Sequence, residues 1–122
     1  MTQYQKYQKQ AVTALTSGEQ LILLFEKACV NISKAVGCIE TNDVSGAHNA
    51  IVAAEDIFNY LIETLDMEYP ISHSLFSLYN FINDRLTQAN IKKDKEILLE
   101  IKPLAVKLKE TWREAERLSR GR

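Results

Sequence analysis

Apolar residues recur every three or four positions in four successive segments of this chain, and no segment alternates apolar and polar residues as a strand does. Each segment is about 20 residues long, enough for a helix that packs along its whole length. Glycine and proline are scarce, at 4 and 2 of 122 residues, so few residues favour tight turns. The pattern predicts an all-α fold: an antiparallel four-helix bundle preceded by an extended or short-helical N-terminal arm.

The first expected helix begins at Ser17, whose hydroxyl can cap the first turn, with Gln20 placed to complete a capping box. Residues 41–43 (Thr-Asn-Asp) are expected to end this helix and to cap the second one. The chain is expected to form one domain over residues 1–122, with the arm at 1–16, the bundle at 17–118 and a short tail at 119–122.

Pro70 disfavours helical geometry at the residue before it and is expected to separate the second helix from the third. Ser72 is then expected to cap the third helix, and Asn90 to end it in a left-handed conformation. Pro103 falls inside the fourth helix, where it removes a backbone hydrogen bond and is expected to bend the helix.

Charge and composition exclude several functional classes. The net charge is −1, so no overall positive field attracts nucleic acid or a membrane surface. No apolar run approaches the roughly 20 residues that span a bilayer, and the polar N-terminus is unlike a signal peptide. Cys29 and Cys38 are too few for a disulfide scaffold and fall on opposite faces of one helix. We therefore expect free thiols and a cytoplasmic protein.

Opposite charges gather in the two halves of the chain. Residues 1–72 carry a net charge of −5 and residues 73–122 a net charge of +4. An acidic pair of helices beside a basic pair is expected to add a modest long-range attraction to the packing.

No residue pattern indicates catalysis. His48 and His73 lack partners at the spacing of metal ligands, and no glycine-rich phosphate loop or nucleophile motif is present. A histidine phosphotransfer bundle stays open only by analogy of fold, with His48 as its candidate. The lysines at 92, 93 and 95 are interrupted by Asp94, are followed by Glu96 and Glu100, and have no aromatic residues among them. This favours a solvated helix start over nucleic-acid binding. We expect no enzyme activity, no cofactor and no metal.

Some helices carry more apolar residues than one buried stripe needs. The third expected helix has Phe76 and Phe81 outside its main stripe, and residues 21–25 of the first are apolar in succession. This excess favours an exposed groove that binds another helix. A fully covered bundle with a wide core and a homodimer are the alternatives.

In several short motifs the chain resembles the FliS family of flagellar secretion chaperones. The most specific match is Arg85-Leu86-x-x-Ala89-Asn90-x-x-x-Asp94. Further matches, in the family's order, are Tyr7, Val12, Thr16, Gly18, Glu19 and Leu24, then residues 65–68 (Leu-Asp-Met-Glu), Leu75-x-x-Leu78-Tyr79 and Leu108-x-x-x-Trp112. The departures are Ser17 in place of the usual Pro, Gln20 in place of Leu, Tyr69-Pro70 in place of a Gly-rich turn, and Pro103.

The resemblance implies a chaperone that binds the C-terminal segment of flagellin, which is disordered when free, and presents it to the flagellar export gate. Binding would bury apolar residues of the client and prevent early polymerisation. A regulatory adaptor for another amphipathic helix is the alternative. The residues expected to contact the client are Ile22, Phe25, Tyr79, Ile82, Leu104 and Leu108.

The remaining expected roles concern the arm and one corner of the bundle. Tyr4 and Tyr7 are expected to form a lid over the empty groove, so that Tyr7→Ala changes client affinity in calorimetry without unfolding the bundle. Arg85, Asn90 and Asp94 are expected to fix the corner between the third and fourth helices. Ile82→Asp is expected to weaken client binding while helicity persists, unless Ile82 belongs to the core.

Overall fold

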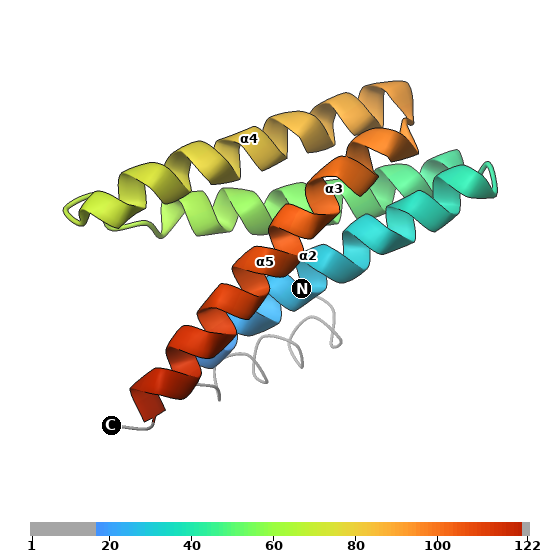
Figure 1. Cartoon of the computed structure of the whole chain (residues 1–122). Helices are drawn as coiled ribbons and strands as arrows, with labels where there is room; N and C mark the ends of the chain where they lie inside the picture. Colours follow the sequence, from blue (N-terminus) through green and yellow to red (C-terminus); the bar gives the residue numbers. More distant parts are fainter. Residues whose placement is uncertain (1–16, 121–122) are drawn as a thin grey trace, which may run out of the picture.

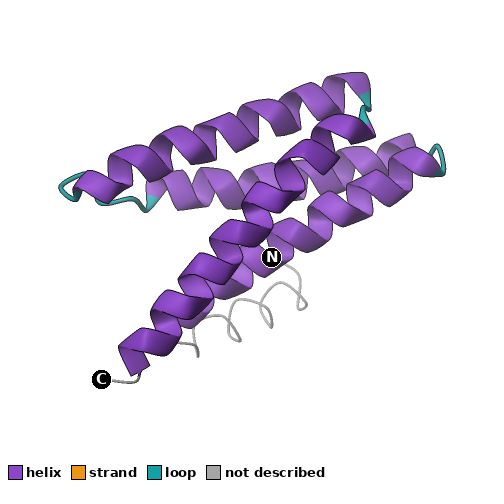
Figure 2. Cartoon of the chain, viewed as in Figure 1, coloured by secondary structure: helices purple, strands orange, loops and turns teal. Residues whose placement is uncertain are grey.

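A computed structural model describes residues 17–120, which form four helices and no strand (Figures 1 and 2). The helices are α2 (Ser17–Glu40), α3 (Val44–Glu63), α4 (Pro70–Lys92) and α5 (Lys95–Arg120). Consecutive helices run in opposite directions, and α5 returns to lie beside α2. The predicted antiparallel four-helix bundle is therefore confirmed.

The turn between α2 and α3 follows the predicted local signals. Asn42 takes the left-handed conformation at φ 60°, which asparagine tolerates better than most residues. The Asp43 carboxylate accepts a hydrogen bond from the Gly46 N–H at 2.9 Å and so caps α3.

Asp43→Ala is expected to lower the free energy of unfolding by about 1 kcal/mol, because it removes the N-cap acceptor from α3. Urea denaturation followed by circular dichroism measures the change. Asp43→Asn keeps a capping oxygen and should retain most of the stability, whereas equal losses in the two variants would contradict a capping role.

The start of α4 corrects the prediction for Ser72. The helix begins two residues earlier, at Pro70, and Ser72 lies buried inside its first turn. Proline suits the first helical position because its φ is already close to the helical value and its missing N–H has no partner there. Tyr69 before it is extended, at φ −89° and ψ 130°, as a residue preceding proline prefers.

The end of α4 corrects the prediction for Asn90. Lys93, and not Asn90, takes the left-handed conformation, at φ 50° and ψ 46°. The helix therefore continues through Asn90 to Lys92. The lysines at 92, 93 and 95 accordingly span the end of α4 and the start of α5. α5 is continuous through Pro103, which lies on an exposed side of the helix.

The four helices form two antiparallel pairs, α2 with α5 and α3 with α4, and the two pairs cross each other (Figure 1). α2 packs against both α3 and α5, and α4 packs against α3. The contact between α4 and α5 is the least extensive of the four neighbouring pairs, because the two helices meet at their shared corner and then diverge. The end of the bundle where α4 begins and α5 ends, and where these two helices lie apart, is named the open end below.

The core lies where the four apolar stripes meet. Tyr79 of α4 packs between Phe25 of α2 and Phe58 of α3, with ring centroids 6.2 and 6.0 Å away. Aliphatic residues of all four helices surround these rings, among them Ile32, Ile51, Leu86 and Ile101. Phe76 and Phe81 stay exposed, as their positions outside the main stripe of α4 predict.

The predicted attraction between the halves of the chain is realised on α2 but not on α3. Lys95 of α5 pairs with Glu40 of α2 at 3.5 Å, and Arg113 pairs with Glu26. The other ion pairs of the described residues lie between α4 and α5 or within α5. No carboxylate of α3 takes part in any of them.

Among residues 17–120, none of the helices combines the length and the apolar character that a membrane span requires.

Candidate functional site

The open end of the bundle contains an apolar cavity of about 270 Å³, named the end groove below. It forms where α3 ends and α4 begins, opposite the first turns of α2 and the distal half of α5. Its lining residues are Leu21, Leu61, Thr64, Leu65, Asp66, Tyr69, Ile71, Ser72, Leu75, Tyr79 and Trp112. A cavity with so few polar groups is suited to apolar side chains of a ligand.

Tyr79 forms the floor of the end groove, and Trp112 of α5 forms the wall beside it. Tyr79 is 1% exposed, and its side chain is hydrogen-bonded to that of Trp112, which we read as the indole N–H donating to the hydroxyl. Burial raises the pKa of Tyr79 above its usual value, and this hydrogen bond opposes part of that increase. The ring is held from below by Phe25 and Phe58. The floor is therefore rigid and neutral.

The rim of the end groove is apolar and accessible. Ile71 is 64% exposed, Tyr69 is also exposed, and Leu75 is half-buried. Ile71, Leu75 and Leu78 follow one another at four and three residues, so they share one face of α4. A ligand at this rim could bury side chains that the bundle leaves in water.

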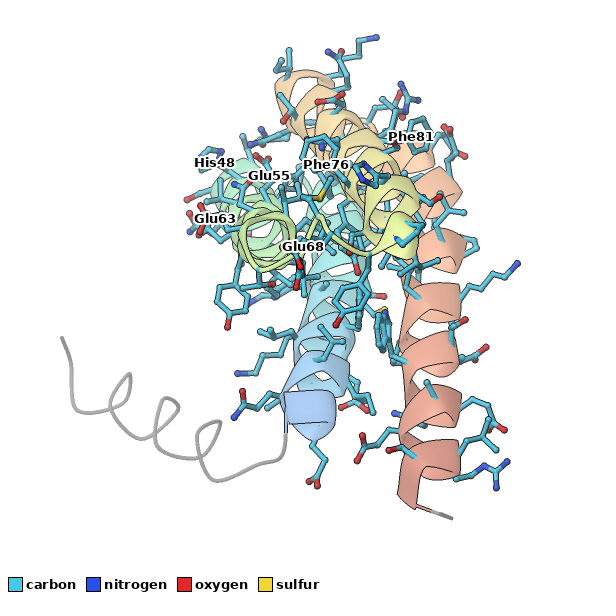
Figure 3. The ribbon with its side chains drawn as sticks, turned by 90° about the vertical axis from the view of Figure 1, so that its left-hand side faces the viewer. His48, Glu55, Glu63, Glu68, Phe76 and Phe81 are labelled. Atoms are coloured by element: carbon cyan, nitrogen blue, oxygen red, sulfur yellow. The ribbon has the colours of Figure 1, made fainter. Side chains whose placement is uncertain are left out.

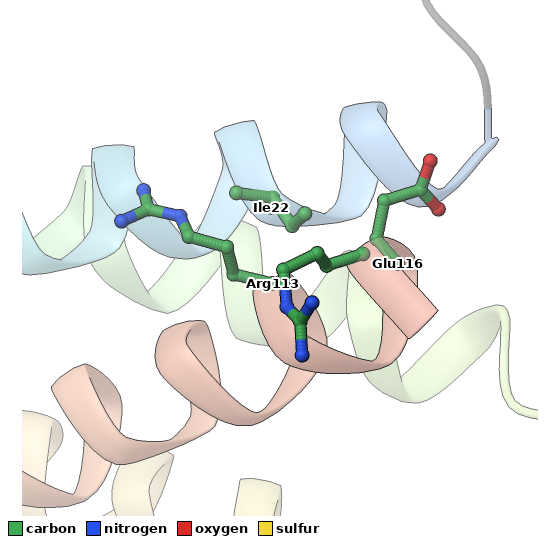
Figure 4. A pocket seen from close by; sticks show the side chains of 4 residues that line it. Ile22, Arg113 and Glu116 are labelled. Atoms are coloured by element: carbon green, nitrogen blue, oxygen red, sulfur yellow. The ribbon is translucent and has the colours of Figure 1, made fainter. Parts of the chain in front are cut away.

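A second depression lies between the first turns of α2 and the last turns of α5 (Figure 4). It has a volume of about 350 Å³ and is lined by Ile22, Arg113, Glu116 and Arg117. The helices approach closely here, since a Cβ added at Gly18 would lie 2.0 Å from the Glu116 carboxylate. Arg113 and Arg117 already pair with Glu26 and Glu114, so this depression presents one aliphatic side chain among neutralised charges.

The residues expected to contact a client divide into two groups in the structure. Ile22 and Leu104 are half-buried, and Ile22 lines the depression between α2 and α5. Phe25 and Ile82 are fully buried and Leu108 nearly so, and none of the three lines the end groove. Tyr79 lines it from below. Tyr4 and Tyr7 fall outside the described residues.

Sequence reasoning missed the residues of the accessible rim of the end groove and the Trp112 wall. Tyr69, Ile71, Leu75 and Trp112 were not among the expected contacts, although all four line the cavity. A signal for Ile71 was present: proline is favoured at the first position of a helix. Starting α4 at Pro70 places Ile71 on the same face as Leu75.

Comparisons with known proteins place the chain in a family. The family model described as "Flagellar protein FliS" matches residues 1–119. The chain belongs to the FliS family. It is 30% identical over 112 residues to the flagellar secretion chaperone FliS of Bacillus subtilis, covering 92% of this chain and 84% of that protein. It is 29% identical over 115 residues to the flagellar secretion chaperone FliSB of Pseudomonas aeruginosa, covering 92% and 91%. The resemblance seen in the sequence is thus confirmed.

The residues that most resemble the FliS signature gather at the corner of α4 and α5. Arg85 pairs with Glu100 of α5 at 3.0 Å. The Lys93 ammonium donates at 2.6 Å to both the backbone and the side-chain oxygen of Asn90. The Asp94 carboxylate accepts from the Glu96 N–H at 2.9 Å. These contacts lie at the end of the bundle opposite the end groove.

The other chemistry-bearing side chains of the described residues form no catalytic arrangement. His48 and His73 are exposed, and residues 17–120 contain no group of three or more side chains suited to hold a metal ion. Cys29 is buried and Cys38 half-buried, both as free thiols on α2. Burial raises the pKa of Cys29, while Lys109 and Lys102 lower it to a smaller extent.

Proposed function

We propose that this FliS-family protein is a cytoplasmic flagellar secretion chaperone that binds the C-terminal segment of flagellin in the end groove. The observation that carries the proposal is the apolar cavity at the open end of the bundle, in a chain similar to two named flagellar secretion chaperones. Apolar side chains of the client would bury the rim formed by Tyr69, Ile71 and Leu75.

The physics of such binding suits a transport chaperone. A segment that is disordered when free loses conformational entropy on binding, and this loss offsets part of the free energy gained from apolar burial. Binding is therefore expected to be reversible. Covered apolar residues of flagellin could not polymerise before export, and the complex could be presented to the export gate.

A helix-binding regulatory adaptor is the second candidate, because an apolar groove by itself does not select flagellin over another amphipathic helix. The two candidates differ in their client and not in their site, so a binding experiment with a flagellin segment separates them.

The direct test is isothermal titration of the full chain with a peptide of about 40 residues from the C-terminus of the host flagellin, repeated at several temperatures. We expect saturable one-to-one binding with a negative heat-capacity change, the mark of apolar burial. No binding at any temperature would remove flagellin as the client and leave the adaptor.

Ile71→Ser is expected to raise the Kd for the flagellin peptide at least tenfold in the same titration, because it removes an exposed aliphatic side chain from the rim of the end groove. Ile91→Ser is the matched control: Ile91 is also on α4 and 73% exposed, but it lies near the opposite end of the helix. Equal losses in the two variants would place the client elsewhere.

A further inference from the structure

Residues 35–84 contain eight Asp or Glu and no Lys or Arg. This stretch includes all of α3 and the first half of α4. Within the described part of the chain, no ion pair involves a residue between Asp43 and Asp84. None of these carboxylates therefore forms an ion pair with a Lys or Arg side chain among the described residues.

The line along which α3 and α4 touch on the outside of the bundle is named the α3–α4 seam below. Side-chain hydrogen bonds mark its course: Asn83 donates to Asn59 at 2.7 Å, and Asn90 contacts the His48 ring at 3.0 Å. Figure 3 shows His48 and Glu55 on α3 and Phe76 on α4 around it. These hydrogen bonds join α4 to α3, so the seam lies on the side of α4 that faces away from α5.

Apolar side chains remain exposed at both ends of this seam. Phe76 is 43% exposed near one end, and Val44 and Ile91 are exposed near the other. Val52 lies half-buried between the ends. The α3–α4 seam therefore combines exposed apolar side chains with carboxylates that form no ion pair, so this surface is amphipathic.

The acidic groups border the seam at helical spacing. Val52, Asp56, Asn59 and Glu63 follow at four, three and four residues and so share a face of α3, and Asp56 and Glu63 are exposed. Glu55 is half-buried in the seam itself. Burial and then the Asp56 carboxylate raise the pKa of Glu55, while a hydrogen bond with Thr87 and the nearby His48 ring lower it.

We propose that the α3–α4 seam is a second docking surface, which binds a cationic amphipathic helix of another protein. Lys or Arg side chains of this helix lie over Asp56 and Glu63, and its apolar face covers Phe76. α3, with its 20 residues, is about 30 Å long and provides room for some five turns of a partner helix. The seam repels nucleic acid and anionic lipid surfaces, whose charge has the same sign.

The helices described for residues 17–120 of a second copy do not offer the complementary surface. α5 is its most basic element, yet five Glu accompany the seven Lys and Arg of that helix. Arg113 and Arg117 are engaged in ion pairs with Glu26 and Glu114, and Lys95 pairs with Glu40. The occupant is therefore a different protein with a more strongly cationic helix.

The test uses the full chain and a labelled 18-residue helical peptide of Leu and Lys, with a Leu and Glu peptide of the same pattern as its counterpart. Fluorescence anisotropy is expected to show binding of the Lys peptide that weakens as salt rises, and no binding of the Glu peptide. Equal binding of the two peptides would overturn the proposal.

Charge reversal locates the site. Glu63→Lys is expected to raise the Kd of the Lys peptide at least threefold, and Asp56→Lys with Glu63→Lys at least tenfold. Glu110→Lys is the matched control, because Glu110 is an exposed carboxylate on α5, which is not a neighbour of α3; it should change the Kd less than twofold. All three substitutions are at exposed positions, and circular dichroism checks that the fold is kept. Equal effects of Glu63→Lys and Glu110→Lys would show attraction by net charge alone.

Two further readouts separate this surface from the end groove. Phe76→Ala should raise the Kd for the Lys peptide at least threefold and leave the Kd for the flagellin peptide unchanged. Ile71→Ser should raise the Kd for the flagellin peptide and leave the Kd for the Lys peptide unchanged. In NMR titrations, bound Lys peptide should lower the pKa of the Glu55 carboxyl. Displacement of the Lys peptide by the flagellin peptide, or weaker Lys-peptide binding in Ile71→Ser, would place both ligands in the end groove and overturn the proposal.

Discussion

Ile82→Asp is expected to abolish the cooperative fold rather than to weaken client binding alone. Ile82 has no exposed surface and packs within the cluster that joins the four helices. A carboxylate there has no basic partner within the core cluster, so burying it costs several kcal/mol whether it stays charged or takes up a proton. That cost is comparable to the whole stability of a small domain, about 5–15 kcal/mol.

The measurement is circular dichroism at 25 °C combined with urea denaturation. We expect Ile82→Asp to lose most of its helical signal, or to unfold at a much lower urea concentration. Ile91→Asp places the same side chain on the same helix at a position that is 73% exposed, and should change stability by no more than about 1 kcal/mol. Normal stability in Ile82→Asp, with only client binding lost, would contradict the burial of Ile82 in the core.

This result would also resolve the two roles that the sequence left open for Ile82. Apolar periodicity identifies the face of a helix that avoids water, but a helix in a bundle buries that face against its neighbours. The residues with the clearest apolar periodicity, such as Phe25 and Ile82, were therefore predicted as client contacts, although they are buried between the helices of the bundle. The accessible rim comes from Tyr69 and Ile71, at the edge of a stripe where packing ends.

Local chemistry explains how far the fold itself was predictable. The cap at Asp43 depends on residues close in sequence, so it was read correctly. Ser72 was misassigned because Pro70 is a strong helix-start signal two residues before it, and Asn90 because α4 continues past a residue that favours a helix end. Pro70 starts α4 earlier, and a hydrogen bond to Lys93 and a contact with His48 keep Asn90 within the helix.

The end groove was beyond the reach of sequence reasoning because it depends on the crossing of helices far apart in the chain. Leu21, Leu65 and Trp112 meet there only because α5 turns away from α4 and lies along α2. No spacing within one helix encodes that angle. The same holds for α3, whose acidic residues were expected to face a basic pair of helices and instead remain without ion pairs.

Trp112→Ala is expected to have the largest effect on client binding among variants that still fold. Trp112 is half-buried, lines the end groove and is hydrogen-bonded to Tyr79. Its removal takes away the wall that faces α4 and exposes the floor to water. Large aromatic residues in partly formed pockets are frequent hot spots, so we expect the Kd for the flagellin peptide to rise at least thirtyfold.

Stability should fall less than affinity in this variant. Complete burial of a tryptophan contributes about 3–5 kcal/mol relative to alanine, and a half-buried one about half as much, so Trp112→Ala should remain folded at 25 °C. Urea denaturation measures this loss and calorimetry the loss of affinity. Leu118→Ala changes an exposed aliphatic residue in the last turns of the same helix and should leave both quantities nearly unchanged.

Trp112→Phe separates the two contributions of the indole. Phenylalanine keeps much of the apolar wall but cannot donate a hydrogen bond to the Tyr79 hydroxyl, which then has to find water or another donor. If apolar area determines binding, Trp112→Phe should retain most of the affinity that Trp112→Ala loses. If the positioning of Tyr79 is what matters, the two variants should lose affinity equally. Unchanged affinity in Trp112→Ala would remove the end groove as the site of the client, while leaving the FliS fold intact.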